Sequence, residues 1–377
     1  MSNHADIKLM TPLTKVFIGI FGFGCILIIY RLLFGLRAVT NLNDYWPWGL
    51  WITIDVLGGV AMAAGGFLIA ATVYILNWKK YKAIVRPAIL NAFFGYALAA
   101  TSITLDLGRP FVIWHPLVMW QINSIMFIVA IHVVLYTTTL ATESSPMVFE
   151  KFGMNKALKT VKKIMVPIVI FGVLLSVLHQ SSLGAVFLIT PSKLSPLWYS
   201  NYLPTWFLFS AVLMGLNMVS FETILSSRVF KHGVPKEVLF GLARGSLIVS
   251  CIYLAVKVLD LVRLGAVGLA FNGNFTSNMY LLEMVVGVIL PIVLLLKKSV
   301  RTNIDRIFEV NIIVIMGVML NRLNVGMFGM SEMASRTGAD YFPSFSEFMV
   351  TAAMVSVAVV GFKICAKYLN LFPETEH

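Results

Sequence analysis

The side chains best suited to chemistry lie inside long apolar segments, where a charge costs at least about 2.5–3.5 kcal/mol. His179, Gln180 and Ser182 occur together in the segment 165–190, with His179 and Ser182 one helical turn apart on the same face. An imidazole exchanges protons near neutral pH, and its neighbours add hydrogen-bonding groups. Asp55, in another apolar segment, has no basic residue one turn away. We therefore expect His179 and Asp55 to carry protons at a polar site.

Two polar motifs each occur twice. Asp106–Arg109 and Asp260–Arg263 both follow the pattern Asp-Leu-x-Arg at the end of an apolar segment. The heptapeptides Leu178–Gly184 and Leu320–Gly326 form the second matched pair. This repetition predicts a duplicated membrane bundle built around buried polar residues. Each Asp–Arg pair has an alternative interpretation as a local i,i+3 ion pair that ends a helix.

A further set of ionisable residues belongs to the second half of the chain. They could form a proton path across the membrane, or they could form ion pairs that hold the helices together; both interpretations stay open. The set comprises Glu222, Lys257, Asp260, Glu283 and Arg322. Only His132 and Glu222 are expected in the inner half of the membrane, His132 as a structural residue or a proton relay.

Membrane helices must position these residues. Hydrophobic residues make up 59% of the chain and charged residues 12%, with a mean hydropathy of +0.87, whereas a soluble domain has about twice that charged fraction. A spanning helix needs about 20 apolar residues. Ten segments qualify, near 13–36, 50–77, 87–107, 117–140, 165–190, 204–226, 238–262, 279–296, 306–325 and 344–368. The chain is predicted to be one all-α polytopic membrane domain over 1–377, with its longest loops near 141–164 and 326–343.

The loop charges predict the topology. Most of the 29 basic residues fall on the side that both termini share, so the positive-inside rule places both termini in the cytoplasm. Helices 2–5 and 6–9 then form two four-helix bundles, within 37–190 and 204–325, that run parallel. A pseudo-twofold axis along the membrane normal would relate them, and helices 1 and 10 would flank them.

Several functions are disfavoured. Walker-type phosphate loops and His-Glu-x-x-His zinc motifs do not occur in the sequence, and the basic residues follow topology rather than a nucleic-acid surface. The isolated Cys25, Cys251 and Cys365 do not predict an iron–sulfur cluster, which normally needs four thiolates. A haem would need a pair of facing histidines, and His132 with His179 is a single candidate pair, so we expect no haem and no bound metal.

Tryptophan is unevenly distributed between the two membrane faces. All but Trp78 are expected near the outer helix ends, where they would form an interfacial belt or a docking surface for a partner protein. The outer set is Trp46, Trp48, Trp51, Trp114, Trp120, Trp198 and Trp206.

A quinone matches the predicted site. Its apolar tail would enter from lipid, and its carbonyls need the hydrogen-bond donors and proton carriers that histidine, aspartate, arginine and serine supply. The rival interpretations are a secondary transporter, whose site would lie near the midplane between the repeats, and a passive membrane anchor. An anchor gives no reason to keep Asp55 and His179 inside the bilayer.

The motifs together resemble the NrfD/polysulfide reductase family of membrane subunits, and most closely its hydrogenase-2-type (HybB-like) branch. The resemblance covers nearly the whole chain. It rests on Trp46–Trp51, Ala63–Phe67, Val85–Ala88, Asp106–Pro110, His179–Gly184, Lys193–Tyr199 and Tyr341–Ser344.

This resemblance implies a haem-free subunit that exchanges electrons with menaquinone or ubiquinone in a bacterial inner membrane, with its functional face periplasmic. The implied partners are a ferredoxin-like iron–sulfur subunit and the large and small subunits of a nickel–iron hydrogenase, or another periplasmic redox enzyme. Proton translocation accompanies turnover in some proposals for the family.

Applied to this site, we expect His179 to bind one quinone carbonyl and Gln180 and Ser182 to orient the ring. Arg109 is expected to keep Asp106 ionised or to stabilise negative charge on the quinone.

Overall fold

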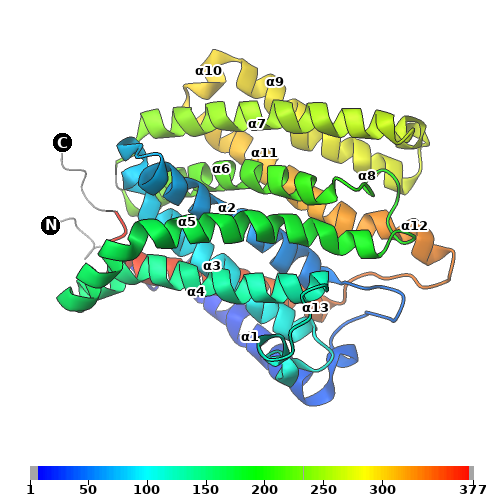
Figure 1. Ribbon diagram of the computed structural model, residues 1–377, viewed down its shortest axis with the longest axis horizontal. Coiled ribbons are helices and arrows are strands. Elements are labelled where there is room, and N and C mark those ends of the chain that lie inside the picture. The colour runs from blue at the N-terminus through cyan, green and yellow to red at the C-terminus, as the bar shows by residue number, and fades with distance from the viewer. Residues whose placement is uncertain (1–6, 232, 373–377) are drawn as a thin grey trace.

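The computed structural model describes residues 7–231 and 233–372. Across these residues the secondary structure is helical without strands, and ten helical spans are long and apolar enough to cross a membrane. Most of them lie side by side along the long axis of the molecule (Figure 1). The predicted all-α, ten-span architecture is confirmed, and the chain is a multi-pass integral membrane protein.

Half of the spans are uninterrupted α-helices: α1 (Pro12–Phe34), α4 (Ile125–Lys151), α6 (Leu203–Phe230), α7 (Lys236–Arg263) and α13 (Phe345–Tyr368). The others are composite: η3 (Trp51–Gly58), α2 (Gly59–Ala70) and η4 (Ala71–Ile75); η5 (Lys79–Tyr81) and α3 (Lys82–Asp106); α5 (Asn155–Val186) and η8 (Phe187–Ile189); α8 (Phe275–Met284), η10 (Val285–Ile289) and α9 (Leu290–Leu296); α11 (Ile304–Leu323), η11 (Asn324–Phe328) and α12 (Gly329–Ser335). η3, η4, η10 and η11 are π-helical turns, a rare form that is frequent at functional sites.

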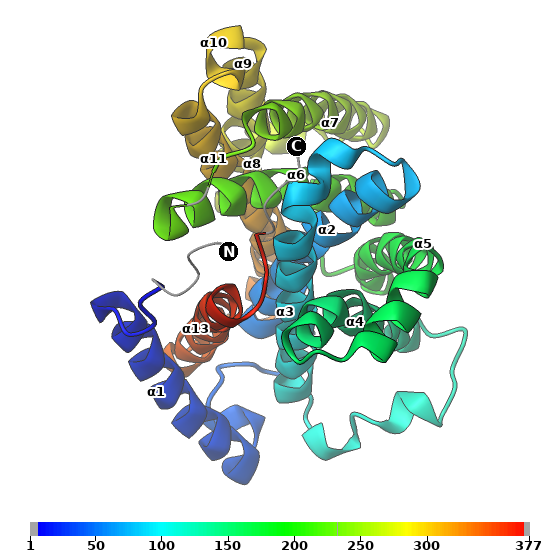
Figure 2. The same cartoon turned by 90° about the vertical axis from the view of Figure 1, so that its left-hand side faces the viewer.

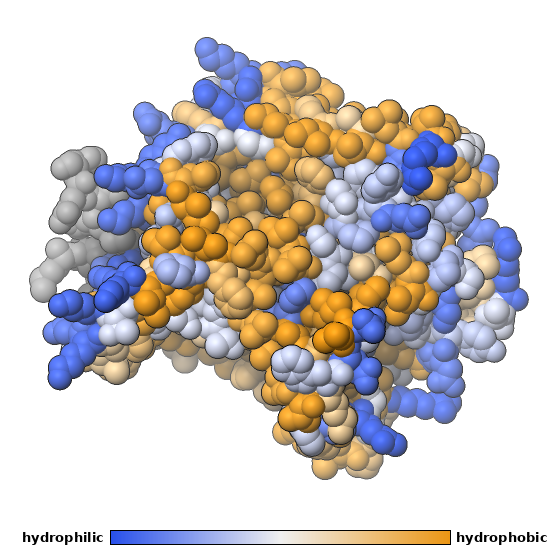
Figure 3. All heavy atoms as spheres, in the orientation of Figure 1, coloured by the Kyte–Doolittle hydropathy of each residue, from blue (hydrophilic) through white to orange (hydrophobic). Residues whose placement is uncertain are grey.

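The surface shows a broad hydrophobic band between two hydrophilic ends (Figure 3). Because successive spans alternate in direction, the lysine- and arginine-rich connections 79–86, 151–163, 228–236 and 297–306 meet at one end, here called the basic end. The connections 35–50, 107–124, 190–202, 264–274 and 336–344 form the opposite, aromatic end. Thus the side chains match a bilayer flanked by two aqueous layers.

The eight central spans pack in two groups. In the first group α2 packs against α3, α3 against α4, α4 against α5 and α5 against α2. In the second, α6 packs against α7 and α11, which both contact the span α8–η10–α9. The groups meet where α2 crosses α6, at Gly65 and Gly215. α1 and α13 pack on each other beside the first group (Figure 2).

The contacts between the groups are reciprocal. Gly184, near the end of α5, packs against Leu203 at the start of α6, and Gly326 in η11 packs against Thr53 in η3. Two halves related by an axis along the membrane normal would produce this pattern, so the contacts support the predicted repeat. The division into 37–190 and 204–325 stays a prediction.

The predicted long loops are wrong. α4 continues to Lys151 and α5 begins at Asn155, so Phe152–Met154 alone connect them. Likewise α11, η11 and α12 form one span to Ser335. Beyond its continuous apolar run, α4 continues through polar and apolar residues that are buried against the protein, such as Glu143, Ser144 and Met147. At its other end α4 begins at Ile125, capped by Ser124, whose Oγ accepts a hydrogen bond from the Phe127 N–H at 3.4 Å.

The contact between α2 and α6 leads to a stability prediction. A Cβ on Gly215 would lie 2.6 Å from Gly65 N and 2.8 Å from the carbonyl carbon of Ala64, and backbone atoms cannot rotate away. Gly215→Ala should therefore destabilise the protein by about 1–3 kcal/mol, measured as a lower thermal midpoint in detergent. Gly19→Ala is the control, because nothing lies within 4 Å of its Cβ. Equal midpoints for the two variants would contradict the close crossing.

Candidate functional site

The predicted catalytic His179 lies in a cluster of rings contributed by three helices. Its side chain is fully buried in α5, and its ring centroid is 5.4 Å from that of Tyr96 in α3 and 6.0 Å from that of His132 in α4. Neither ring nitrogen has a hydrogen-bond partner among the described residues. Buried polar atoms normally have hydrogen-bond partners. The two ring nitrogens of His179 are therefore available to bind water or a ligand.

Ser182 lies between His132 and the backbone of His179, and Gln180 joins α5 to α2. Ser182 Oγ donates to the carbonyl oxygen of His179 at 2.9 Å and lies 3.4 Å from His132 Nδ1. Gln180 Nε2 donates to the carbonyl oxygen of Val60 in α2 at 2.9 Å, while its Oε1 is unpartnered within 7–231 and 233–372. The structure therefore brings together the three residues of the first heptapeptide that were predicted to act together.

The expectation that His132 lies in the inner half of the membrane is wrong. α4 begins at Ile125 rather than near 117, so His132 is seven residues (132 − 125) from that end of the helix, about 10 Å. His179 is likewise seven residues (186 − 179) from Val186, the last residue of α5. Both histidines thus lie at one level in the outer part of the first group of helices.

A cavity of about 400 Å³ lies next to the histidines at the aromatic end. Its walls come from η3, α3, α4 and α5 and are mainly apolar. Leu183 in the wall directly follows Ser182, and Val129 in the wall is one turn before His132. Apolar walls with few polar groups are typical of small-molecule sites. The polar lining residues, which the sequence did not single out, are His115, Gln121 and Ser124.

Asp55 belongs to a different polar cluster, directed towards α13. Its Oδ2 accepts hydrogen bonds from Thr351 at 3.0 Å and Ser102 at 3.4 Å. Among the described residues, the neighbouring Val56 and Leu57 line the cavity, whereas Asp55 itself does not. Neither Asp55 nor His179 is among the described residues that line the cavity, and the two side chains belong to different clusters.

Arg31, rather than Arg109, is the arginine near Asp106. Arg31 is 2% exposed; its Nε donates to the Leu105 carbonyl at 2.7 Å, its Nη2 donates to the Leu107 carbonyl, and its charge acts on Asp106. Arg109 is exposed, and the ion pairs of the described chain do not include one between it and Asp106. Sequence reasoning missed Arg31 because it lies 75 positions (106 − 31) before Asp106, in the first apolar segment.

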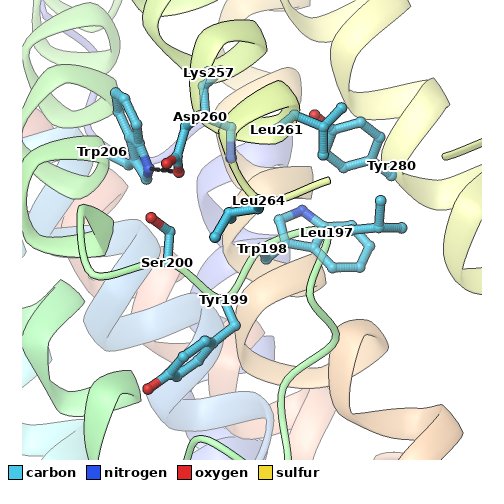
Figure 4. A pocket seen from close by; sticks show the side chains of 10 residues that line it. All are labelled: Leu197, Trp198, Tyr199, Ser200, Trp206, Lys257, Asp260, Leu261, Leu264 and Tyr280. Carbon is cyan, nitrogen blue, oxygen red and sulfur yellow. Dashed lines mark hydrogen bonds between the residues drawn. The ribbon is translucent and has the colours of Figure 1, made fainter. Parts of the chain in front are cut away.

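In the second copy of the motif the local ion pair forms. Asp260 Oδ1 accepts from Arg263 Nη2 at 2.8 Å and Nε at 3.0 Å, and its Oδ2 accepts from Trp206 Nε1 at 3.3 Å. Figure 4 shows this carboxylate beside Trp206 and Lys257 at a small crevice that Tyr280 of α8 also lines. Of the two motif copies, the second one has the ion-pair arrangement.

Glu283 and Arg322 are held in one hydrogen-bond network. Arg322 is fully buried, and it donates to Asn321 Oδ1 at 2.8 Å and to Ser210 Oγ at 2.9 Å. Asn321 in turn donates to Glu283, and Lys257 interacts electrostatically with that carboxylate. The donors to Glu283 are Trp198, Asn321 and Asn324, at 2.7–2.8 Å.

Glu222 stands apart from these residues. It lies in α6, eight residues (230 − 222) from the basic end of that helix. Within the described ranges, its side chain forms no hydrogen bond or ion pair with Lys257, Asp260 or Glu283. The structure therefore brings together four of the five residues predicted for the second bundle and leaves Glu222 apart from them.

Most of the outer tryptophans form neither a belt nor a docking surface. Trp46, Trp48, Trp51, Trp198 and Trp206 are buried, because they pack inside the ends of the helix groups. Trp51 Nε1, for example, donates to the Glu347 carbonyl at 3.1 Å. Trp114 and Trp120, at 50% and 71% exposed, lie in the connection beside the cavity. For these two, an interfacial belt or a docking surface stays the interpretation.

Comparisons with known proteins agree on one family. Residues 38–331 match the family model described as "Polysulphide reductase, NrfD". The chain is 31% identical to the "Probable Ni/Fe-hydrogenase 2 b-type cytochrome subunit" of Escherichia coli K12, over 92% of this chain and 89% of the relative. It is 26% identical to the "Menaquinone reductase, integral membrane subunit" of Nitratidesulfovibrio vulgaris Hildenborough, over 97% and 93%. A 36% identical segment of a selenate reductase subunit from Mesobacillus selenatarsenatis covers 27% of this chain and 24% of that relative.

The network around Arg322 leads to a second stability prediction. Arg322→Met leaves the Asn321 and Ser210 acceptors unpaired and removes a cation near Glu283, so it should destabilise the protein by about 3–5 kcal/mol. Arg306→Met breaks an ion pair whose side chains are 63% and 58% exposed, and it should cost about 0–1 kcal/mol. Thermal unfolding in detergent, followed by tryptophan fluorescence, compares them. A small effect of Arg322→Met would show that the network does not stabilise the fold.

Proposed function

Because the chain belongs to the polysulphide reductase NrfD family, we propose that it is the quinone-reactive membrane subunit of a respiratory oxidoreductase. It exchanges electrons between an iron–sulfur subunit and membrane menaquinone or ubiquinone. The supporting observation is the cavity of about 400 Å³, whose wall residues Val129 and Leu183 lie one turn from His132 and next to Ser182 along their helices. Its apolar walls fit a prenylated ring, and the nearby imidazole and hydroxyl groups fit the ring carbonyls.

The residues around the cavity have distinct proposed roles. A bound quinone supplies reversible two-electron, two-proton chemistry. His179 holds and exchanges a proton, Ser182 positions the His132 imidazole at 3.4 Å, and Gln180 sets the orientation of α5 through its bond to α2. Asp55 acts as a second proton carrier on the α13 side, held by Thr351 and Ser102.

The end of α3 forms the proposed rim of this site. The charge of the buried Arg31 acts on Asp106, whose Oδ1 has no hydrogen-bond partner among the described residues. Arg109 is exposed between Leu107 and Val112, which both line the cavity. Arg109 was expected either to keep Asp106 ionised or to stabilise negative charge on the quinone. Its position at the cavity mouth supports the second role.

For the second group of helices we propose a structural role. Glu283 and Arg322 have their hydrogen bonds largely satisfied by asparagine, serine and tryptophan, and Asp260 is paired with Arg263. Groups held in this way are poorly suited to pass protons on, because each transfer would break a buried bond. The proton-path interpretation of Glu222, Lys257, Asp260, Glu283 and Arg322 is therefore the less favoured of the two.

The proposed setting is a bacterial inner membrane with both termini in the cytoplasm and the aromatic end facing the periplasm. The positive-inside rule supports this orientation, since the basic connections lie on the side where the first span begins and the last span ends. At the aromatic end a ferredoxin-like iron–sulfur subunit would dock and connect to a nickel–iron hydrogenase or another periplasmic redox enzyme. The names of the relatives support this class of partner.

The quinone site is tested in the native complex, purified through a tag on this subunit. After pre-reduction of the iron–sulfur partner, stopped-flow absorbance follows its reoxidation by decylubiquinone. His179→Ala and Asp55→Asn should each slow reoxidation at least about tenfold, since positioned proton carriers contribute about 10²–10⁴. Glu309→Gln, at an exposed site in the basic end, should keep the native rate.

Two outcomes would contradict the proposal. Native rates in the assembled His179→Ala and Asp55→Asn complexes would remove those residues from the site. A native subunit that purifies without a redox partner and transports a solute would instead indicate a secondary transporter.

The absence of haem is a separate expectation. The name of the Escherichia coli relative mentions a b-type cytochrome, and His132 and His179 are close enough to raise the question. We expect the dithionite-reduced minus oxidised spectrum of the purified subunit to lack b-type haem bands, because Ser182 and Tyr96 already pack against these imidazoles. Bands that disappear in His132→Ala and His179→Ala would contradict this expectation.

A further inference from the structure

The segment that joins α3 to α4 is apolar although it lies outside the membrane-spanning helices. Residues 110–124, here called the apolar connection, include no aspartate, glutamate, lysine or arginine. Exposed apolar patches mark contacts with a membrane or with another protein. Six large side chains of the apolar connection are 50–76% exposed without lining the cavity: Phe111, Trp114, Leu117, Val118, Trp120 and Ile122.

The apolar connection has two faces. Val112, His115 and Met119 are among its residues that line the cavity. The six exposed side chains alternate with these lining residues along the chain and point to the outside of the molecule. The connection is therefore a thin wall, with the cavity on one face and the protein surface on the other.

The backbone of this wall suits the edge of a bilayer. It forms two short 3-10 turns, η6 (Pro110–Val112) and η7 (His115–Leu117), which pair some of its N–H groups internally. The indole N–H of the exposed Trp120 donates to the Leu117 carbonyl at 3.1 Å, also within the connection. Irregular backbone does not occur against lipid in the hydrocarbon core, so the headgroup region is the depth that fits this segment.

The second group of helices has an equivalent segment. α7 and α8 are joined by residues 264–274, which also include no charged residue and expose Phe271 by 71%. In Figure 1 the apolar connection is near the bottom of the molecule and 264–274 is at the top right. Because the bilayer surrounds the protein, lipid can contact both segments. The other three connections at the aromatic end contain charged residues: Arg37, Asp44, Lys193, Arg336 and Asp340.

The apolar connection is continuous with the lipid-facing surface of α4. Met126 and Val134 recur at helical spacing on that helix and are 49% and 43% exposed. Met126 also lines the cavity. The cavity therefore reaches the side of the protein that faces lipid, just beside the connection.

We propose that the apolar connection lies in the headgroup region of the bilayer at the aromatic end, with its six exposed side chains in lipid, and that the cavity receives its ligand from the bilayer through this wall. The route of the ligand rests on the proposed quinone function, whereas the contact with lipid does not. Tryptophan and phenylalanine side chains favour this depth. A prenylated ring reaches the cavity sideways from lipid and does not cross the aqueous layer.

The depth of the connection is tested on the full chain in nanodiscs of phosphatidylethanolamine and phosphatidylglycerol. In a background whose three cysteines are replaced by alanine, Val118→Cys and Ile122→Cys carry nitroxide spin labels. Power saturation compares their collisions with oxygen, which dissolves in lipid, and with the water-soluble complex Ni-EDDA. The ratio of oxygen to nickel collisions should be several-fold higher at both positions than at Thr337→Cys, in the charged connection 336–344. Ile248→Cys, a 60% exposed position near the middle of α7, is the lipid reference.

A partner protein on this surface is the alternative, and cross-linking in the native complex separates it from lipid. Benzoylphenylalanine in place of Ile122 should give a phospholipid adduct on illumination, detected by mass spectrometry, as it should in place of Ile248. An adduct with another subunit would overturn the contact with lipid. The same conclusion would follow if the ratio of oxygen to nickel collisions at positions 118 and 122 equalled that of Thr337→Cys.

The route of the ligand is tested with the native complex in proteoliposomes, where reoxidation of the pre-reduced iron–sulfur partner is followed at increasing decylubiquinone. Phe111→Glu should raise the half-saturating concentration several-fold and keep the saturating rate, because a carboxylate draws the wall out of lipid without touching the proton carriers. Phe111→Leu should behave as the unaltered complex. Phe342→Glu is the matched control, since Phe342 is 74% exposed against 76% for Phe111 but belongs to a connection outside the cavity wall.

The two proposals fail in different ways. A native half-saturating concentration in Phe111→Glu and in Val118→Glu would overturn the route through the wall and leave the quinone function intact. An unaltered complex that does not reduce decylubiquinone would overturn the quinone function, whereas the spin-label and cross-linking results would still decide whether the connection lies in lipid.

Discussion

The absence of water from the bilayer core is the constraint on which the rest of this structure depends. A polar group buried there must find a partner within the protein or hold a ligand or water. The second group of helices satisfies most of this need internally, since Glu283, Arg322 and Asp260 have hydrogen bonds or ion pairs, although Arg322 Nε, Asn324 Oδ1 and Ser250 Oγ have no partner among the described residues. In the first group, His179, Tyr96 and Tyr136 lack such partners as far as the described residues extend. This difference in polar satisfaction locates the proposed chemistry.

We interpret the differences between the two groups of helices as divergence of the predicted repeat. Close glycine contacts, such as Gly65 with Gly215, allow the helices of the two groups to approach closely. Under the predicted repeat, the crevice beside Asp260 corresponds in position to the cavity in the first group. In the second group the side chains of Trp198 and Trp206 occupy this region and bind its carboxylates. In the first group the same region is an apolar cavity.

Asp55 and His179, which the sequence placed at one site, belong to two separate polar clusters in the structure. Asp55 is held by Thr351 of α13, and the charge of Arg31 of α1 acts on Asp106. His179 instead meets His132 and Tyr96. The flanking helices α1 and α13 therefore do more than surround the bundles, because α13 supplies a hydrogen-bond donor to the buried Asp55 and α1 supplies a cation near the half-buried Asp106.

The fold class could be predicted because the bilayer imposes a simple rule on composition. A helix needs about 20 apolar residues to cross, so hydropathy located the ten spans, and the charge of the loops indicated their direction. Helix ends were less predictable. α4 begins late, at Ile125, and continues past its apolar run to Lys151, because the hydrogen bonds of a helix do not require an apolar sequence. This shift moved His132 to the level of His179 and placed Glu143 inside a helix.

The motifs by themselves determined that Asp55, His179 and the two Asp-Leu-x-Arg copies lie in a membrane protein of this family. Tertiary structure alone decided which of them meet. Arg31 and Thr351 lie far from Asp106 and Asp55 along the chain, and no local spacing pairs them. Gly172 lies against Glu143 only because α4 and α5 pack together. The physical reason is that pairing, burial and unpaired hydroxyl groups are properties of helix contacts, which form between segments that the sequence keeps apart.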